Sequence, residues 1–423
     1  MPALPNPVHV AADAERAGAD GSELHPFALL DDAAVAISDA ATWQGKILVH
    51  EGRYEHPLSD VLLPATAALE IEAGTTFAMG PGVSLHVQRN VLAIGTDAKP
   101  ILFTGLEEGQ HWGGVTVTAP SSPASLFEHA IFEHGYETAF NGLSRLAALS
   151  FSEASASLSH CIFRDNEGSE ALHFTVGKGR VEFSEFTNNS SNALQAFDCL
   201  ESIEIEHNSF IENGNDAIKV SNTTAFIHEN LINGCADKGI SGAEQSSANI
   251  EHNVIVGCNI GIANKNGATL RVSNNTLYGN GIGFMVFQTS ASYGSGKGTF
   301  TGNIVWSSGV RDLDVDSNDE TVYSYSCIEN LEGVPADSVG LISKGNGCDD
   351  PLFANPDQMD FHVRSEAGRF DPASLAWVKD DVTSPCIDAG PPGTDVGDEP
   401  APNGGRINLG YDGGTERASL SRE

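Results

Sequence analysis

The sequence predicts an all-β parallel solenoid, in which short strands from successive turns of the chain stack in register. The first observation is a repeat whose asparagines are spaced by 22, 23, 22 and 28 residues: Asn208, Asn230, Asn253, Asn275 and Asn303. The second is that the apolar alternations in the repeats are only two to four residues long and are broken by Gly and Asn, which is too short for helices. A period in the low twenties is typical of stacked coils.

Each repeat also carries inward-facing positions at fixed distances from its asparagine. An apolar residue follows two places later, at Phe210, Ile232, Ile255, Leu277 and Val305. A small or polar residue follows five places later, at Asn213, Cys235, Cys258, Asn280 and Ser308. No repeat can bury these side chains alone, so neighbouring repeats must stack, with strands roughly 4.8 Å apart. The asparagines are therefore expected to form a structural ladder whose amides bind one another and the turn backbone.

This ladder, together with alternations such as Gly239-Ile240 and Gly261-Ile262, resembles the right-handed parallel β-helix superfamily typified by pectate lyases and polygalacturonases, of the bacterial secreted type. The resemblance covers about residues 45–330, and parallel crossovers are right-handed on general grounds. It implies an exported protein, secreted or at the cell surface. The residues after Met1 contain no apolar leader segment, so we expect a leader to have been removed.

Three parts are expected along the chain: an N-terminal arm and cap over residues 1–44, the β-helix over residues 45–345, and an irregular C-terminal capping extension over residues 346–423. The polar, Ala-rich residues 1–25 favour a disordered or loosely packed arm. Residues 33–37 are expected to form a short helix over the first coil, because an open solenoid end exposes unpaired strand edges. Residues 136–156 are expected to form either a longer excursion or a less regular coil, and residues 288–297 a second loop.

The charge balance limits the possible partners. The chain has 57 acidic residues against 22 Lys and Arg, a net charge of −35, which disfavours nucleic acids and anionic membranes. It has no apolar run long enough to span a bilayer, so no membrane insertion is expected. The resemblance points to an extracellular polysaccharide as the partner. An acidic polysaccharide would have to bind at a local basic patch.

Seven cysteines are too irregularly spaced for a disulfide scaffold or a zinc site. Cys161, Cys235 and Cys258 lie at or near the small-residue position of the repeat, and we expect them to be core residues. Cys348 and Cys386 could pair in the C-terminal region, with Cys327 as an alternative partner.

The second short strand of each repeat offers a surface for chemistry, because β-helix enzymes bind substrate along an outer sheet face. Alternation predicts one outward column: His173, Gln195, Lys219, Ser241, Ala263, Met285 and Asp314. The turn positions just before these strands are Glu170, Asn192, Asp216, Lys238 and Ile260. Glu244 and Lys265 are expected at the far edge of the same patch.

Bases are scarce in this chain, so several lysines near one strand are informative. A lyase acting on a uronic acid polymer needs a base to take the C5 proton and a cation to neutralise the carboxylate. The predicted catalytic residues are Lys219, His173, Lys238 and Asp216, and the predicted substrate-binding residues are Glu170, Gln195, Glu244, Lys265 and Arg271. The alternative interpretation is that Lys219 and Asp216 are solvated residues in weak ion pairs.

The strand that carries Lys219, within residues 213–220, loosely resembles the lysine-bearing strand of one pectate-lyase family. The resemblance implies that Lys219 acts as the base. That family places calcium-binding aspartates one coil earlier. Here the matching segment, residues 191–195, contains no acid and so departs from the family pattern.

A second candidate is the acidic strand with Asp312, Asp314 and Asp316, which alternation would place on one face. Three such carboxylates either share a hard cation such as Ca²⁺ or form an exposed acidic strand. No other cofactor is expected. The polygalacturonase signature, the set of motifs NTD, DD, GHG and RIK, is absent, which makes a glycoside hydrolase less favoured.

These observations predict an exported, carbohydrate-active β-helix, and the favoured activity is β-elimination of an acidic polysaccharide by a polysaccharide lyase. The alternative is a non-catalytic surface, adhesion or assembly solenoid that binds glycan or protein. The two classes differ in whether a uronate polymer yields an unsaturated product.

Overall fold

The computed structural model describes residues 4–40, 42–56, 58–119, 123–136, 138–140, 143–145, 147–290 and 292–422. It confirms the predicted all-β parallel solenoid, with about 12 turns and little helix. The chain forms two compact units: residues 1–204 with 208–216 are unit 1, and residues 205–207 with 217–423 are unit 2. No helix in the described part of the chain is long and apolar enough to cross a membrane.

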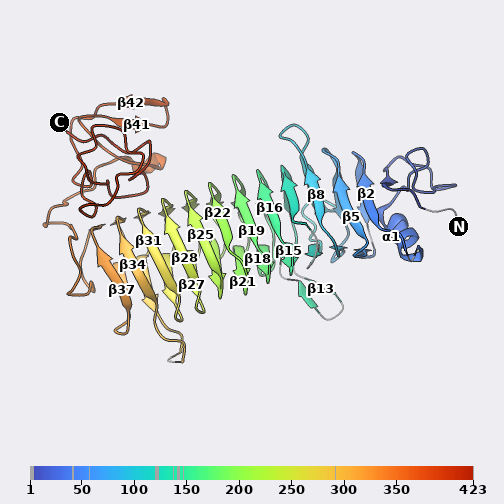
Figure 1. Ribbon diagram of the computed structural model, residues 1–423, viewed down its shortest axis with the longest axis horizontal. Helices are drawn as coiled ribbons and strands as arrows, with labels where there is room; N and C mark the ends of the chain where they lie inside the picture. The colour runs from blue at the N-terminus through green and yellow to red at the C-terminus, as the bar shows by residue number, and fades with distance from the viewer. Residues whose placement is uncertain are drawn as a thin grey trace. The chain divides into compact units, whose positions relative to one another are not determined.

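Within unit 1 the strands of successive turns lie side by side in three parallel sheets (Figure 1). Sheet I contains β1 (Val8–Val10), β2 (Gly45–Val49), β5 (Ala67–Ile71), β8 (Val91–Ile94), β11 (Ser125–Glu128), β16 (Ala156–Ser159) and β19 (Gly179–Glu182). Sheet II contains β4 (Val61–Leu63), β7 (Ser84–Val87), β10 (Gly114–Thr118), β15 (Ala147–Ser152), β18 (Glu170–Thr175) and β21 (Asn192–Phe197). Sheet III contains β3 (Arg53–His56), β6 (Thr76–Met79), β9 (Ile101–Gly105), β12 (Ala130–Glu133), β17 (Ile162–Arg164), β20 (Glu185–Thr187) and β23 (Ser209–Ile211).

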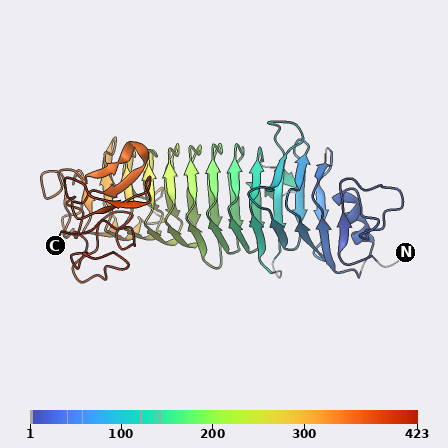
Figure 2. The ribbon, with the colours of Figure 1, turned by 90° about the horizontal axis from the view of Figure 1, so that it is seen from above.

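Unit 2 repeats the same three-sheet arrangement, and the stacking of its strands can also be followed in Figure 2. After β22 (Ile203–Glu206), its sheet I contains β25 (Thr224–His228), β28 (Ser247–Glu251), β31 (Thr269–Ser273), β34 (Lys297–Thr301) and β37 (Glu320–Ser324). Its sheet II contains β24 (Ile218–Ser221), β27 (Lys238–Ala243), β30 (Ile260–Lys265), β33 (Ile282–Phe287) and β36 (Arg311–Val315). Its sheet III contains β26 (Leu231–Asn233), β29 (Val254–Val256), β32 (Thr276–Tyr278), β35 (Ile304–Trp306) and β38 (Cys327–Ile328).

The predicted asparagine ladder is confirmed, and its bonds explain the repeat. In unit 2, Asn253 Nδ2 donates to the carbonyls of Ile227 and Glu251, at 2.9 and 3.0 Å, and to Asn275 Oδ1 at 2.9 Å. Asn275 Nδ2 donates in the same way to Asn303 Oδ1 at 3.0 Å. The residue before each asparagine has a left-handed backbone, as at His252 with φ 57°. Each amide therefore satisfies turn backbone that would otherwise be buried without a partner.

The core of unit 1 contains a column of stacked phenylalanines, whose ring centroids are 4.7 to 5.3 Å apart. They come from the same position of successive turns in sheet III: Phe77, Phe103, Phe132, Phe163, Phe186 and Phe210. All six are buried. Aromatic pairs at this spacing add to the stability given by their burial alone.

The N-terminal segment is more ordered than the sequence suggested. The prediction that residues 1–25 form a disordered or loosely packed arm is wrong for β1, which extends sheet I and pairs Val8 with Ile47. Its inner valines are fully buried, so apolar alternation in three residues outweighs the polar composition around it. The predicted covering helix is present and is longer than expected, α1 (Leu30–Asp39). Its buried face contacts β1 and β4.

Both predicted excursions occur, with one correction. A hairpin formed by β13 (Thr138–Phe140) and β14 (Leu143–Arg145) leaves the solenoid. Residues 137, 141, 142 and 146 of this predicted excursion lie outside the described residues. The rest of the expected excursion is regular, because residues 147–152 form β15 in sheet II. The loop between β33 and β34 matches the expected excursion at residues 288–297, of which residue 291 lies outside the description.

The C-terminal segment lies against the outer face of sheet III in unit 2. It contains two antiparallel pairs and one 3₁₀ turn: β39 (Phe353–Asn355) with β40 (Asp360–Val363), β41 (Arg369–Asp371) with β42 (Ala376–Val378), and η1 (Pro356–Gln358). Phe353 and Phe361 pack there with Ile304 and Trp306 of the solenoid. Tyr411 N donates to Thr276 Oγ1 at 3.2 Å, which ties the end of the chain to β32.

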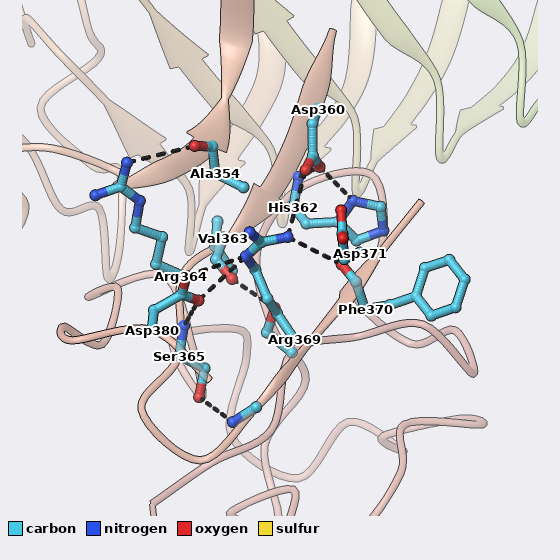
Figure 3. A network of polar contacts seen from close by, with 12 residues as sticks. Ala354, Asp360, His362, Val363, Arg364, Ser365, Arg369, Phe370, Asp371 and Asp380 are labelled. Carbon is cyan, nitrogen blue, oxygen red and sulfur yellow. Dashed lines mark hydrogen bonds and ion pairs between the residues drawn. The ribbon is translucent and has the colours of Figure 1, made fainter. Parts of the chain in front are cut away.

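A partly buried ion network links residues of this segment (Figure 3). Arg369 lies between Asp360 and Asp380, at 3.4 and 3.1 Å, and Asp360 also contacts His362 Nδ1 at 2.7 Å. The Ser365 amide donates to Asp380 at 2.9 Å. Buried charges require such partners, so this network has a structural explanation.

One of the two disulfide alternatives is present: Cys327 pairs with Cys348. Cys386, which the other alternative paired with Cys348, is a buried free thiol, and the three sulfurs lie within 4.8 Å of one another. The remaining cysteines, including the predicted core residues Cys161, Cys235 and Cys258, are buried as single thiols.

A buried acid in the C-terminal segment gives a pH-dependence prediction. Glu399 is 6% exposed, its Oε1 accepts from the amides of Asn408 and Gly414, and burial raises its pKa to about 7. The folded protein therefore holds a proton that the unfolded chain releases near pH 4.5, so the free energy of unfolding falls as the pH rises towards 7. Glu399→Gln should reduce this loss by about 3 kcal/mol, measured by chemical denaturation at about pH 5 and about pH 8.

The matched control for this measurement is Glu416→Gln, which removes an exposed acid from the same segment. The free energy of unfolding of this variant should depend on pH as it does in the wild type. Equal pH dependence in wild type and Glu399→Gln would show that Glu399 is ionised when folded.

Candidate functional site

The outer face of sheet II has the register that the sequence predicted. In unit 1, His173 lies beside Gln195, and Glu170 beside Asn192. In unit 2 one row runs across five strands: Lys219, Ser241, Ala263, Met285 and Asp314. Residues more than 90 positions apart in sequence thus share one row, because the strands stack in parallel.

In unit 1 the predicted residues form a nearly buried polar cluster. His173 and Glu170 are 5% and 6% exposed, and His173 Nδ1 lies 3.6 Å from Glu170 Oε2. His173 Nε2 contacts Thr175 Oγ1 at 2.5 Å. Asn192 links Gln195 and Asp216. Its Nδ2 donates to Gln195 Oε1 at 3.3 Å, and its Oδ1 accepts from the Asp216 amide at 3.2 Å. These side chains are outside the core, but neighbouring side chains cover them.

In unit 2 the central residue is Lys219 on β24. It is half-buried and makes no hydrogen bond or ion pair with any residue that the structure describes. Its neighbour in the row, Ser241, is fully buried, and its Oγ has no hydrogen-bond partner among the described residues. Lys238, by contrast, forms an ion pair with Asp237 and is mostly buried. Lys219 is therefore the lysine of this face that is open to a ligand.

Of the three other predicted binding residues, Glu244 and Lys265 lie at the edge of sheet II and Arg271 lies in sheet I. Glu244 follows β27 in a left-handed turn, with φ 53°, and Lys265 ends β30, with its Nζ 5.9 Å from the Phe287 ring centre. Both lie at the edge of sheet II, as expected. Arg271 lies in β31 of sheet I, exposed and in register with Asn249 and Thr299, so it does not share the face of Lys219. Sequence alternation places a residue inside or outside, but it does not say which of the three sheets carries it.

The acidic strand β36 does not gather its carboxylates around one point. Asp312 is 5% exposed, and its Oδ2 accepts from the Asn330 amide at 2.8 Å. Asp314 Oδ1 binds Arg311 Nη1 at 3.1 Å, and Asp316 Oδ1 accepts from the Asn318 amide at 2.9 Å. Each of the three carboxylates thus has a partner of its own, and among the described residues they do not belong to a group of three converging metal ligands.

Comparison with known proteins agrees with the architecture. Residues 147–305 match the family model described as right handed beta helix region. Among solved structures, pectate lyase Pel9A is 15% identical with a TM-score of 0.50, over 97% of this chain and 96% of that chain.

Two other solved structures match less closely. The Azotobacter vinelandii mannuronan C-5 epimerase AlgE4 A-module is 13% identical with a TM-score of 0.41, over 79% of this chain and 94% of that chain. The periplasmic alginate epimerase AlgG is 12% identical with a TM-score of 0.40, over 70% and 77%. No curated protein sequence matches the chain significantly. The protein thus has the right-handed β-helix fold of pectate lyase-like proteins.

Proposed function

We propose that this protein is an exported polysaccharide lyase that cleaves an acidic polysaccharide by β-elimination on the outer face of sheet II. The observation that carries the proposal is Lys219, a half-buried cation without a protein partner among the described residues, on a sheet face of a chain with net charge −35. An unpaired lysine gives an anionic ligand a local positive charge on a protein whose net charge otherwise repels it. The fold likeness to a pectate lyase is consistent with this proposal but does not specify the reaction.

In the proposed step, the side-chain nitrogen of Lys219 takes the proton at C5 of a uronate residue. The electron pair of that C–H bond forms the C4–C5 double bond, and the C4–O bond breaks with its electron pair on the oxygen. Water protonates this oxygen as the preceding sugar leaves, and Lys219 returns its proton to solvent. Binding of the uronate carboxylate by a cation lowers the barrier, because it stabilises the charge that develops next to C5. Lys238, which lies in the same unit as Lys219, is the proposed assisting group. No step is assigned to Ca²⁺, since the acids of β36 do not converge.

The test is to incubate the protein with alginate, pectate, ulvan and glycosaminoglycans, with and without calcium, and to follow the ultraviolet absorbance of unsaturated uronates. We expect product from at least one polymer. Lys219→Ala should lower the rate by a factor of about 10² or more, since positioned base catalysis is worth that much. Its melting temperature should stay near that of wild type, because the side chain has no described partner to lose.

The matched control is Lys297→Ala, which removes an exposed lysine from sheet I and should keep full activity. Retained activity in Lys219→Ala would refute the assignment of the base. No product from any polymer would refute the lyase and favour a non-catalytic solenoid that binds glycan or protein.

A further inference from the structure

The hairpin of β41 and β42, in the C-terminal segment of unit 2, presents apolar side chains to solvent. Trp377 on β42 is 44% exposed, and Leu375 in the turn is 78% exposed. Trp377 is in register with the half-buried Phe370 of β41, and the two rings meet edge to face with centroids 6.3 Å apart. The indole N–H of Trp377 has no acceptor among the described residues. Both a ring surface and a hydrogen-bond donor are therefore open to a ligand.

A free cation adjoins the same pair of rings. The guanidinium carbon of Arg417 lies 5.1 Å from the centre of the Phe370 ring. Arg417 is exposed, and its guanidinium forms no ion pair or hydrogen bond within the part of the chain that the structure describes. Asp371, the acid of this hairpin, accepts instead from the Ser374 hydroxyl at 2.5 Å and from the Ala373 amide at 3.3 Å. The guanidinium donors of Arg417 are therefore available to an anion.

The size and the charge of this surface decide the ligand class. One aromatic side chain offers at most about 250 Å², so the hairpin exposes far less than the roughly 800 Å² per partner of a stable protein interface. One or two sugar rings need only such an area, and the negative face of an aromatic ring attracts the C–H groups of a pyranose. A guanidinium pairs with a carboxylate through two parallel hydrogen bonds. A sugar acid satisfies both groups at once.

We infer that the β41–β42 hairpin and Arg417 form a second polysaccharide site, which holds a uronate-containing polymer by stacking on Trp377 and by pairing a carboxylate with Arg417. The hairpin belongs to the segment that packs on sheet III, whereas Lys219 lies on sheet II. The site performs no chemistry. A long polymer held there stays at a high local concentration around the same protein. The ligand class rests on the proposed function, but binding at this site needs no cleavage.

Calorimetric titration with polygalacturonate, alginate and hyaluronan, and with the neutral, carboxyl-reduced form of each polymer, tests this inference. The full chain carries Lys219→Ala in every titration, so that no polymer is cleaved. At least one acidic polymer should bind, and its carboxyl-reduced form should bind more weakly. Adding Trp377→Ala should raise the Kd of the acidic polymer about tenfold, because the stacked contact and its buried apolar area are lost. Trp377→Tyr keeps an aromatic face and should restore most of the affinity.

A second variant covers the case in which Trp377→Ala disturbs the hairpin, because Arg417 lies outside it. Arg417→Ala should raise the Kd of the acidic polymer about tenfold, since a charge-assisted pair is lost, and should leave the Kd of the carboxyl-reduced polymer unchanged. The matched controls are Phe226→Ala and Lys297→Ala, which remove an exposed ring and an exposed lysine from sheet I. Both should bind like the Lys219→Ala background.

The titrations contain no cleavage step, so a protein that yields no unsaturated product and a protein that fails to bind at this hairpin are separate outcomes. The inference is overturned if no acidic polymer binds, or if Trp377→Ala and Arg417→Ala both bind like their background. Equal affinity for the acidic and the carboxyl-reduced polymer would exclude the carboxylate pair with Arg417. Analytical ultracentrifugation covers the remaining alternative, since self-association that Trp377→Ala abolishes would make the hairpin a protein contact instead.

Discussion

Asn253→Ala is expected to lower the free energy of unfolding by roughly 3–5 kcal/mol, a large effect for one side chain. Asn253 is fully buried and donates to two backbone carbonyls and to Asn275 Oδ1. Its own Oδ1 accepts from the amide and the side chain of Asn230, both at 3.0 Å. Alanine would leave these groups buried without partners, since water cannot reach them. Chemical denaturation followed by circular dichroism measures the loss.

The matched control is Asn249→Ala in the same turn. Asn249 lies on the outward side of β28, half-buried, so its replacement should change stability by about 0.5 kcal/mol or less. Equal effects of the two substitutions would mean that the hydrogen bonds of Asn253 in the asparagine ladder do not stabilise the fold.

Phe163→Ala is expected to destabilise the protein by about 3–5 kcal/mol. Phe163 is fully buried and lies between two parallel rings, 5.0 Å from Phe132 and 4.8 Å from Phe186. The substitution leaves a cavity and removes two stacking contacts at once, and the rigid strands above and below cannot close the gap.

Phe226→Ala serves as the comparison for this second substitution, because Phe226 is an exposed phenylalanine on β25. Its removal should lower the free energy of unfolding by well under half of the loss expected for Phe163→Ala. A small loss for Phe163→Ala, similar to that for Phe226→Ala, would show that the phenylalanine column packs loosely.

The fold could be predicted because its main interaction repeats in the sequence. Each ladder asparagine occupies the same place in its turn, so a spacing such as that from Asn230 to Asn253 directly encodes a contact. The register of the Lys219 row followed from the same periodicity and from alternation within strands. Local patterns of this kind need no knowledge of distant parts of the chain.

The parts that could not be predicted depend on irregular segments. The disulfide partner of Cys348 and the placement of the last residues against sheet III are set by packing of single, non-repeating side chains. A cavity of about 500 Å³ beside Asp312 in unit 2 could not be predicted for the same reason, because Asn330 and Lys344 reach it from a segment after the repeats end. The separate partners of Asp312 and Asp314 likewise depend on side-chain contacts that alternation does not encode.

Residues of successive turns stand in register, and a distance between two outward positions of sheet I in unit 2 measures this stacking. Ser247 is in register with Thr269, Thr269 with Lys297, and Lys297 with Glu320. Spin labels at positions 247 and 320 should therefore report a narrow distance distribution for backbones about 14 Å apart, three strand spacings along the stack. A broad distribution, or a mean distance twice as long, would contradict the parallel stacking on which the proposed lysine site depends.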